Sequence, residues 1–102
     1  MLERKNTVGV ITKQAPPDKY ALVMLNDDVT PLDKVIKVLT EVFEYQMQAA
    51  VSLARKAEGS GAVVIKTHLT KDECRKYIKS ALKIAPTLGI MMKKEKSKNG
   101  NL

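Results

Sequence analysis

The residue types best suited to chemistry in this sequence stand together at Asn26, Asp27 and Asp28, directly before Thr30 and Pro31. One interpretation is structural: Asn26 and Asp28 form Asx-type turns that satisfy free backbone N–H groups. The other is functional: the surplus carboxylate and amide point outward and accept hydrogen bonds from a ligand. Such a ligand is a cation, because these oxygens are acceptors and the carboxylates are negatively charged. Both interpretations stay open at this stage.

The polar residues 26–30, called the corner below, need elements that hold them in place. Residues 20–25 are apolar, partly β-branched and of strand length, which predicts a buried strand. Thr30 as N-cap and Asp33 three residues later predict a helix over residues 31–44. The corner is therefore expected where a strand ends and a helix begins.

The remaining elements follow from the same kinds of signal. Apolar residues recur at helical spacing before the glycine-rich residues 59–61, with Met47 expected on the buried side. Helical spacing returns after Thr70 and Glu73, which form a second capping box. The predicted elements are a strand at 20–25, helices at 31–44 and 46–58, a strand at 62–68, a helix at 70–85 and a strand at 88–92.

This order predicts an α+β fold. The most economical arrangement is a two-layer sandwich in which a three-stranded sheet carries all three helices on one face. A length of 102 residues and a hydrophobic fraction of 44% suit a single domain. The domain is expected at residues 18–94, between a flexible N-terminal extension at residues 1–17 and a basic C-terminal tail at residues 95–102.

Several function classes are excluded or disfavoured. The single cysteine, Cys74, excludes an internal disulfide, and together with the single histidine, His68, it excludes a Cys/His metal site. No nucleophile–base pair or phosphate-binding glycine loop is present, and His68 is expected to be solvated without a partner acid, so neither an enzyme nor a cofactor is expected. No apolar run approaches the roughly 18 residues of a membrane span, and a cytoplasmic location is expected.

The formal net charge of +7 raises another class, a basic nucleic-acid-binding or ribosome-associated protein. Residues 18–58 carry five basic and seven acidic side chains, so the positive charge lies in the ends and in the helix after Thr70. The lysines of that helix and of the tail keep this alternative open. It lacks clustered aromatics to stack on bases, because Tyr20, Tyr45 and Tyr77 stand singly.

The corner and its flanks resemble the ClpS-type adaptor family. The resemblance is carried by Lys19-Tyr20, by Leu25-Asn26-Asp27-Asp28-Val29-Thr30-Pro31-Leu32, and by Val35-Ile36 and Val38-Leu39. The predicted element order over residues 19–94 matches the family as well. Members bind the exposed N-terminus of a protein with a bulky hydrophobic first residue, and they hand that protein to a Clp-type AAA+ unfoldase and its peptidase.

The resemblance implies a role for each residue of a substrate site. Asn26 and Asp27 would hold the α-ammonium of the substrate, which agrees with the cation expected from the residue types alone. Apolar residues on the following helix would bury the first side chain. The implied substrate-binding residues are Asn26, Asp27, Asp28, Thr30, Leu32, Val35, Ala57 and Glu58.

The sequence departs from the family pattern at three places. Leu32 stands where a methionine usually gates the pocket, and Glu58 stands where the family places a histidine, next to the small Ala57. The implied unfoldase-docking patch on the last helix retains an acid, Asp72, but has Tyr77 where a lysine is expected, and the adjacent Lys76 is expected to face elsewhere. Its residues are Asp72, Lys76 and Tyr77. These departures indicate a divergent adaptor.

Overall fold

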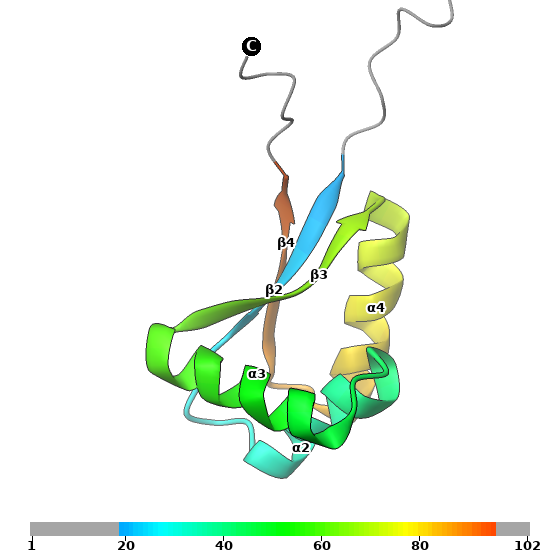
Figure 1. Cartoon of the computed structure of the whole chain (residues 1–102). Coiled ribbons are helices and arrows are strands. Elements are labelled where there is room, and N and C mark those ends of the chain that lie inside the picture. The colour runs from blue at the N-terminus through cyan, green and yellow to red at the C-terminus, as the bar shows by residue number, and fades with distance from the viewer. Residues whose placement is uncertain (1–18, 96–102) are drawn as a thin grey trace, which may run out of the picture.

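The computed structural model describes residues 19–95 (Figure 1). Its elements are β2 (Tyr20–Leu25), α2 (Leu32–Lys37), η1 (Val38–Val42), α3 (Met47–Ser60), β3 (Ala62–Leu69), α4 (Lys71–Ile84) and β4 (Gly89–Lys94). The π-helical turn η1 continues α2 without a break, so the two form one helical segment. The predicted order of strand, helix, helix, strand, helix, strand is therefore confirmed. The extension predicted at residues 1–17 lies outside the described residues, as does the tail beyond Glu95.

β2 is the central strand of a three-stranded antiparallel sheet of order β3-β2-β4. Its last residue, Leu25, lies opposite Ala62 of β3 on one side and opposite Gly89 of β4 on the other. A Cβ atom on Gly89 would lie only 3.1 Å from the Leu25 Cβ. Glycine at this position therefore lets β4 approach β2 closely, just where the chain enters the corner.

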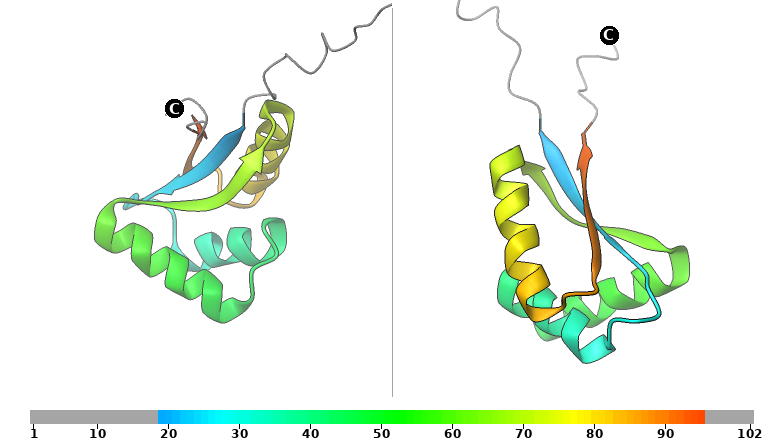
Figure 2. Two further views of the ribbon diagram at one scale, coloured as in Figure 1. Left: turned by 45° about the horizontal axis from the view of Figure 1, so that its top comes forward. Right: turned by 180° about the vertical axis from the view of Figure 1, so that it is seen from behind.

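All three helical segments lie on one face of the twisted sheet, as predicted (Figure 2). The segment α2–η1 and helix α3 pack against each other as a hairpin, and α3 contacts β3. Helix α4 packs against η1 and against all three strands. The resulting two layers are the α+β sandwich expected from the sequence.

The core between the layers is mostly aliphatic. Its largest fully buried side chains are Leu22, Met24, Leu39, Ile65, Val38 and Cys74. Burial raises the pKa of the Cys74 thiol, which keeps this side chain protonated and unreactive, as expected of a small core residue. Phe43 packs at the edge of the core and stacks on the Tyr77 ring of α4, with 4.9 Å between ring centroids.

Helix α4 begins as predicted. The Thr70 hydroxyl accepts a hydrogen bond from the Glu73 backbone N–H at 3.1 Å, and the Glu73 carboxylate accepts one from the Thr70 N–H at 2.8 Å. The equivalent prediction for the first helix is wrong. Helix α2 starts at Leu32 with Pro31 as N-cap, and no side chain caps it. The hydroxyl of Thr30 makes other contacts in the corner, described below.

Helix α3 extends further than predicted. It includes Gly59 and Ser60, and it ends at Gly61, which adopts the left-handed conformation with φ of 89°. This C-cap glycine donates its N–H to Ala57 and accepts a hydrogen bond from the Asn26 N–H at 2.9 Å. The end of α3 is thereby attached to the first residue of the corner. Met47, expected on the buried side of this helix, is 60% exposed.

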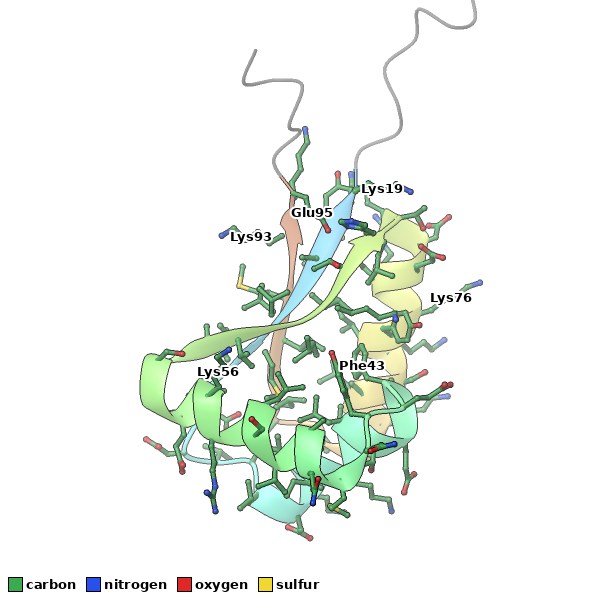
Figure 3. All side chains as sticks on the ribbon, viewed as in Figure 1. Lys19, Phe43, Lys56, Lys76, Lys93 and Glu95 are labelled. Atoms are coloured by element: carbon green, nitrogen blue, oxygen red, sulfur yellow. The ribbon has the colours of Figure 1, made fainter. Side chains whose placement is uncertain are left out.

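The far end of the sheet carries a polar clasp formed by His68 and Glu95. The Glu95 carboxylate accepts a hydrogen bond from the His68 N–H at 2.5 Å and lies 3.1 Å from the imidazole Nδ1. The Glu95 N–H donates to the Lys19 carbonyl at 2.9 Å (Figure 3). His68 is solvated as predicted, but the prediction that it has no partner acid is wrong, because Glu95, the first residue of the predicted tail, lies against it.

Within residues 19–95 no helix is both long and apolar enough to cross a bilayer.

Candidate functional site

A pocket of about 270 Å³ opens beside the corner, between the end of β2, the start of α2, the last turns of α3 and the turn before β4. It is called the corner pocket below. One part of its wall is polar and acidic, and the other is apolar. Its lining residues are Met24, Leu25, Asn26, Asp27, Asp28, Thr30, Leu32, Val35, Ala54, Ala57, Glu58 and Leu88.

Asp27 organises the polar wall through hydrogen bonds to its own turn. Its Oδ1 accepts from the backbone N–H of Val29 at 2.8 Å and of Thr30 at 2.5 Å. Its Oδ2 accepts from the Thr30 hydroxyl at 3.0 Å. An ionised carboxylate offers roughly four acceptor positions, so Asp27 keeps capacity for a further donor from the pocket. The Asx-type turn thus exists, but Asp27 makes it and not Asn26 or Asp28.

These hydrogen bonds keep Asp27 ionised. The bond from the Thr30 backbone N–H is the largest cause that lowers the pKa of the Asp27 carboxyl, and further bonds from Val29, the Thr30 side chain and the Gly89 backbone act in the same direction. Partial burial opposes them but does not prevail. The pocket therefore holds a fixed negative charge at neutral pH.

Two more carboxylates lie at the pocket mouth. Asp28 and Glu58 are both exposed, and within the described residues neither forms a hydrogen bond or an ion pair. Glu58 lies in the last turn of α3, near the partly negative end of the helix dipole. The mouth therefore attracts positive charge, and no lysine or arginine belongs to its lining.

The apolar wall is assembled from several elements. Met24 is fully buried at its base, Val35 contributes from α2, and Leu88 contributes from the turn before β4. The two alanines of α3, Ala54 and Ala57, lie three residues apart on one helix face and leave room between them and the strand end. Leu32 stands at the rim with 61% of its surface exposed.

The structure brings all eight predicted substrate-binding residues to this one pocket. Their individual roles stay predictions. Four lining residues were missed: Met24, Leu25, Ala54 and Leu88. Ala54 could have been found from its helical spacing to Ala57. Leu88 had no local signal, because its place in the pocket depends on the packing of β4 against β2.

The three predicted docking residues do not share one surface. Asp72 is exposed and forms an ion pair with Arg75 at 3.2 Å on its own helix. Lys76 is exposed and extends away from the fold (Figure 3), whereas Tyr77 is half-buried against Phe43, with Lys66 Nζ 5.6 Å from its ring centroid. Lys76 and Tyr77 line a second hollow of about 400 Å³ between η1 and α4, called the α4 groove. Its lining residues are Glu41, Val42, Glu73, Lys76, Tyr77 and Ser80.

The chemistry available in the corner pocket is recognition. A fixed carboxylate, an amide and two further carboxylates line one side of the pocket, and apolar side chains line the other. Among residues 19–95 no three or more histidine, cysteine or acidic side chains are grouped as a metal site would require. The pocket is thus suited to a small ligand that carries a positive charge next to an apolar group.

Comparisons with known proteins agree with this geometry. The sequence model of the ATP-dependent Clp protease adaptor protein ClpS matches residues 15–90. The ClpS adapter of Leptothrix cholodnii is 41% identical over 49 residues, which cover 48% of this chain and 43% of that protein. The ClpS adapter of Nitrosomonas eutropha is 35% identical over 57 residues, which cover 56% and 55%. The matched stretch thus spans about half the length of these relatives.

One solved structure matches over the whole length of its own chain. It is Agrobacterium tumefaciens ClpS2 bound to L-phenylalaninamide, with a TM-score of 0.73 and 25% sequence identity. The match covers 78% of the present chain and 100% of that chain.

Proposed function

The chain belongs to the ClpS family of ATP-dependent Clp protease adaptor proteins, and from this premise we propose that it binds free protein N-termini whose first residue is bulky and hydrophobic. In this proposal it delivers those proteins to a Clp-type AAA+ unfoldase. The chain acts as an adaptor in the cytoplasm and not as an enzyme. Residues 18–94 form the adaptor domain, flanked by the N-terminal extension and the C-terminal tail.

The proposal rests on one observation: acidic side chains and apolar side chains lie next to each other in the corner pocket. A protein N-terminus presents an ammonium group and a side chain on the same carbon atom, so its receptor needs acceptors and an apolar cavity side by side. Asp27 and Asn26 are suited to the ammonium, because charge-assisted hydrogen bonds are the stronger kind. Val35 and Leu88 line the space available to the side chain.

The similarity to ClpS2 supports this arrangement. L-Phenylalaninamide, the ligand of that structure, carries a free α-ammonium group and a benzyl side chain. Its amide stands where the next peptide bond of a protein would be. A ligand of this kind has the same two features that the corner pocket is built to receive.

Two residues give this chain its own version of the site. Glu58 places a carboxylate where the family has a histidine, so the pocket mouth attracts the ammonium more strongly, and its acidic side chains repel one another when the pocket is empty. Leu32 is branched and has fewer rotatable bonds than methionine, so the gate adapts to fewer side-chain shapes. We expect a narrower range of accepted first residues than a methionine gate would permit.

We propose that the unfoldase docks on the exposed face of α4 and also contacts the α4 groove. Lys76 and Glu73 offer opposite charges there, and Glu41 adds a third from η1. Tyr77, which is packed against Phe43, supports this surface instead of projecting from it. A protein partner suits such a mixed, shallow and charged surface.

Titration of labelled peptides that differ only in the first residue tests the proposal directly. At least one peptide beginning with Phe, Leu, Trp or Tyr should bind, and peptides beginning with Gly, Ser or Glu should not. Acetylation of the N-terminus should abolish binding of the best peptide, because it removes the positive charge. Binding that persists after acetylation would contradict the proposal.

The alternative, nucleic-acid binding, depends on the lysines of α4. Lys76, Lys79 and Lys83 are all exposed, but Asp72 and Glu73 at the start of the same helix oppose them. Oligonucleotide binding through these lysines would weaken steeply with salt and disappear when all three are changed to glutamate. Tight binding of this kind at physiological salt, with no peptide binding, would favour the alternative.

A further inference from the structure

Residues 87–89, which connect α4 to β4, lie beside the corner and its pocket. The hydroxyl of Thr87 lies 2.8 Å from the hydroxyl of Thr30, although Thr87 does not line the pocket. Leu88 lines the pocket directly. Gly89, the first residue of β4, lies opposite Leu25, the residue that precedes the corner. The hydrogen bond between Thr87 and Thr30 thus connects the corner to a segment that lies 57 residues further along the chain.

The direction of the Thr87–Thr30 hydrogen bond can be deduced. Thr30 has one hydroxyl proton, and it donates that proton to Asp27 Oδ2 at 3.0 Å. Asp27 is ionised and can only accept, since the pKa of its carboxyl is lowered. The Thr30 oxygen must therefore accept from Thr87. The three side chains form one chain of donors, from the Thr87 hydroxyl through the Thr30 hydroxyl to the carboxylate.

We propose that Thr87 is a positioning residue of the substrate pocket, which acts through the Thr30 hydroxyl to hold Asp27 in its binding geometry. The inference rests on the proposed function of the corner pocket, and it adds to that function a residue outside the pocket lining. Thr87 itself does not contact the substrate.

The physical reason is that these hydrogen bonds order the corner before the ligand binds. The corner is an exposed loop, and ordering a loop when the ligand binds opposes binding. A hydroxyl chain that is complete in the free protein removes that entropic cost beforehand. It also strengthens each member, because a donor that itself accepts a hydrogen bond is polarised by it. Loss of the first donor should loosen Thr30 and thereby misdirect the lone pairs of Asp27.

Calorimetric titration of the full chain with L-phenylalaninamide tests the proposal with three variants. Thr87→Val keeps the shape and removes the hydroxyl, so binding should weaken about three- to tenfold, the scale of one hydrogen bond. Thr87→Ser keeps the hydroxyl and should bind within about twofold of the parent. The matched control is Thr67→Val on β3, an exposed threonine whose hydroxyl makes no hydrogen bond to any described residue. It should leave binding unchanged.

A second measurement separates this inference from the proposed function. In amide NMR spectra of the free proteins, Thr87→Val should shift the signals of Val29 and Thr30, while Thr87→Ser and Thr67→Val should leave them close to the parent positions. If the parent binds and Thr87→Val binds equally well, the positioning role is overturned and the proposed function stands. If the parent binds neither L-phenylalaninamide nor any of the peptides with a bulky hydrophobic first residue, the proposed function fails, and unchanged Val29 and Thr30 signals in Thr87→Val would overturn the positioning role as well.

Discussion

The corner pocket and the α4 groove are two hollows on one small domain, yet they are built differently. The wall of the corner pocket is held by hydrogen bonds: the Asp27 carboxylate accepts three, and the Thr30 hydroxyl also bonds to the hydroxyl of Thr87. The α4 groove is lined mostly by exposed side chains, among which Tyr77 stacks on Phe43 and the Glu73 carboxylate accepts a hydrogen bond from the Thr70 N–H.

This difference indicates what each surface can recognise. A fixed carboxylate beside an apolar cavity discriminates between small groups, because misplacing them leaves a charge unpaired. Mobile charges around a shallow groove adapt to a large partner and contribute mainly to its rate of association and its specificity. Changes in the pocket should therefore alter substrate binding alone, and changes in the groove should alter unfoldase binding alone.

Asp27→Asn is the change expected to break the pocket most severely. It keeps the shape but removes the negative charge and weakens the contacts to Val29 and Thr30. Affinity for a peptide with a hydrophobic N-terminus should fall by about 2 to 3 kcal/mol, or roughly 30- to 150-fold. Fluorescence anisotropy of a labelled peptide measures this. The control is Asp33→Asn, which removes an exposed acid outside the pocket lining and should bind like the parent.

The same variant has a predicted pH signature. The pKa of the Asp27 carboxyl is lowered in the folded protein, so its charge stabilises the fold above the ordinary pKa of an aspartate. That contribution is lost as the pH falls through the lowered, folded-state pKa. The difference in unfolding free energy between the parent and Asp27→Asn should therefore be present at pH 7 and shrink in acid. A difference that grows in acid would contradict this assignment.

Glu58 variants sharpen the comparison within the pocket. Glu58→Gln should weaken peptide binding by roughly 1 to 2 kcal/mol if the carboxylate reaches the ammonium. It should also slightly stabilise the empty protein, because it removes repulsion from Asp27 and an unfavourable charge at the end of α3. Glu58→His should bind as well as the parent or better. If both Glu58 variants bind the peptide as tightly as the parent while Asp27→Asn binds it more weakly, Glu58 does not belong to the binding site.

Lys76→Glu tests whether the two hollows are independent. Reversing this exposed charge should weaken binding to a Clp-type unfoldase by up to about 1 kcal/mol per charge pair affected, with a clear salt dependence. Peptide affinity should not change. Surface plasmon resonance at two salt concentrations provides the measurement, with Lys56→Glu on α3 as an exposed control away from the groove. A loss of peptide affinity in Lys76→Glu would show that the hollows are coupled.

The smallest effect is expected at the far end of the sheet. The backbone hydrogen bond from His68 is the main cause that lowers the pKa of the Glu95 carboxyl. Its charge therefore stabilises the fold above the ordinary pKa of a glutamate, and this is lost as the pH falls through the lowered value. Glu95→Gln should destabilise the protein slightly at pH 7 and not at all in strong acid, as followed by thermal unfolding. Peptide binding in the corner pocket should not change, since Glu95 follows the end of β4 that lies opposite the start of β2, away from the corner.

Much of the fold could be predicted from the sequence because its signals are local. The capping box at Thr70 and Glu73, the strand at residues 20–25 and the helical spacing in α4 each depend on neighbours within a few residues. The element order and the one-sided helix layer followed from these signals. The corner was also recognisable, because its string of polar residues is specific in this setting.

The predictions that were wrong or missing concern contacts between residues that lie far apart in the sequence. Thr30 was predicted to cap α2, but its hydroxyl is engaged by Asp27 and by Thr87, and the second contact exists only after β4 has joined the sheet. Leu88 enters the pocket for the same reason. His68 was predicted without a partner acid, yet Glu95 reaches it from 27 residues away. Such contacts are set by tertiary packing and leave no periodic trace in the sequence.

The placement of β2 between its two partners has a consequence for biosynthesis. β2 is the first described element to leave the ribosome, and its partner β4 is the last. Contacts between segments so far apart in the chain form slowly, and they cannot form before translation has passed β4. The pocket wall contributed by Leu88, and the hydroxyl of Thr87 beside Thr30, therefore join the corner only after residues 87–94 have been synthesised. A chain that ends before Thr87 lacks this part of the pocket wall, so it should bind a hydrophobic N-terminus more weakly than the parent.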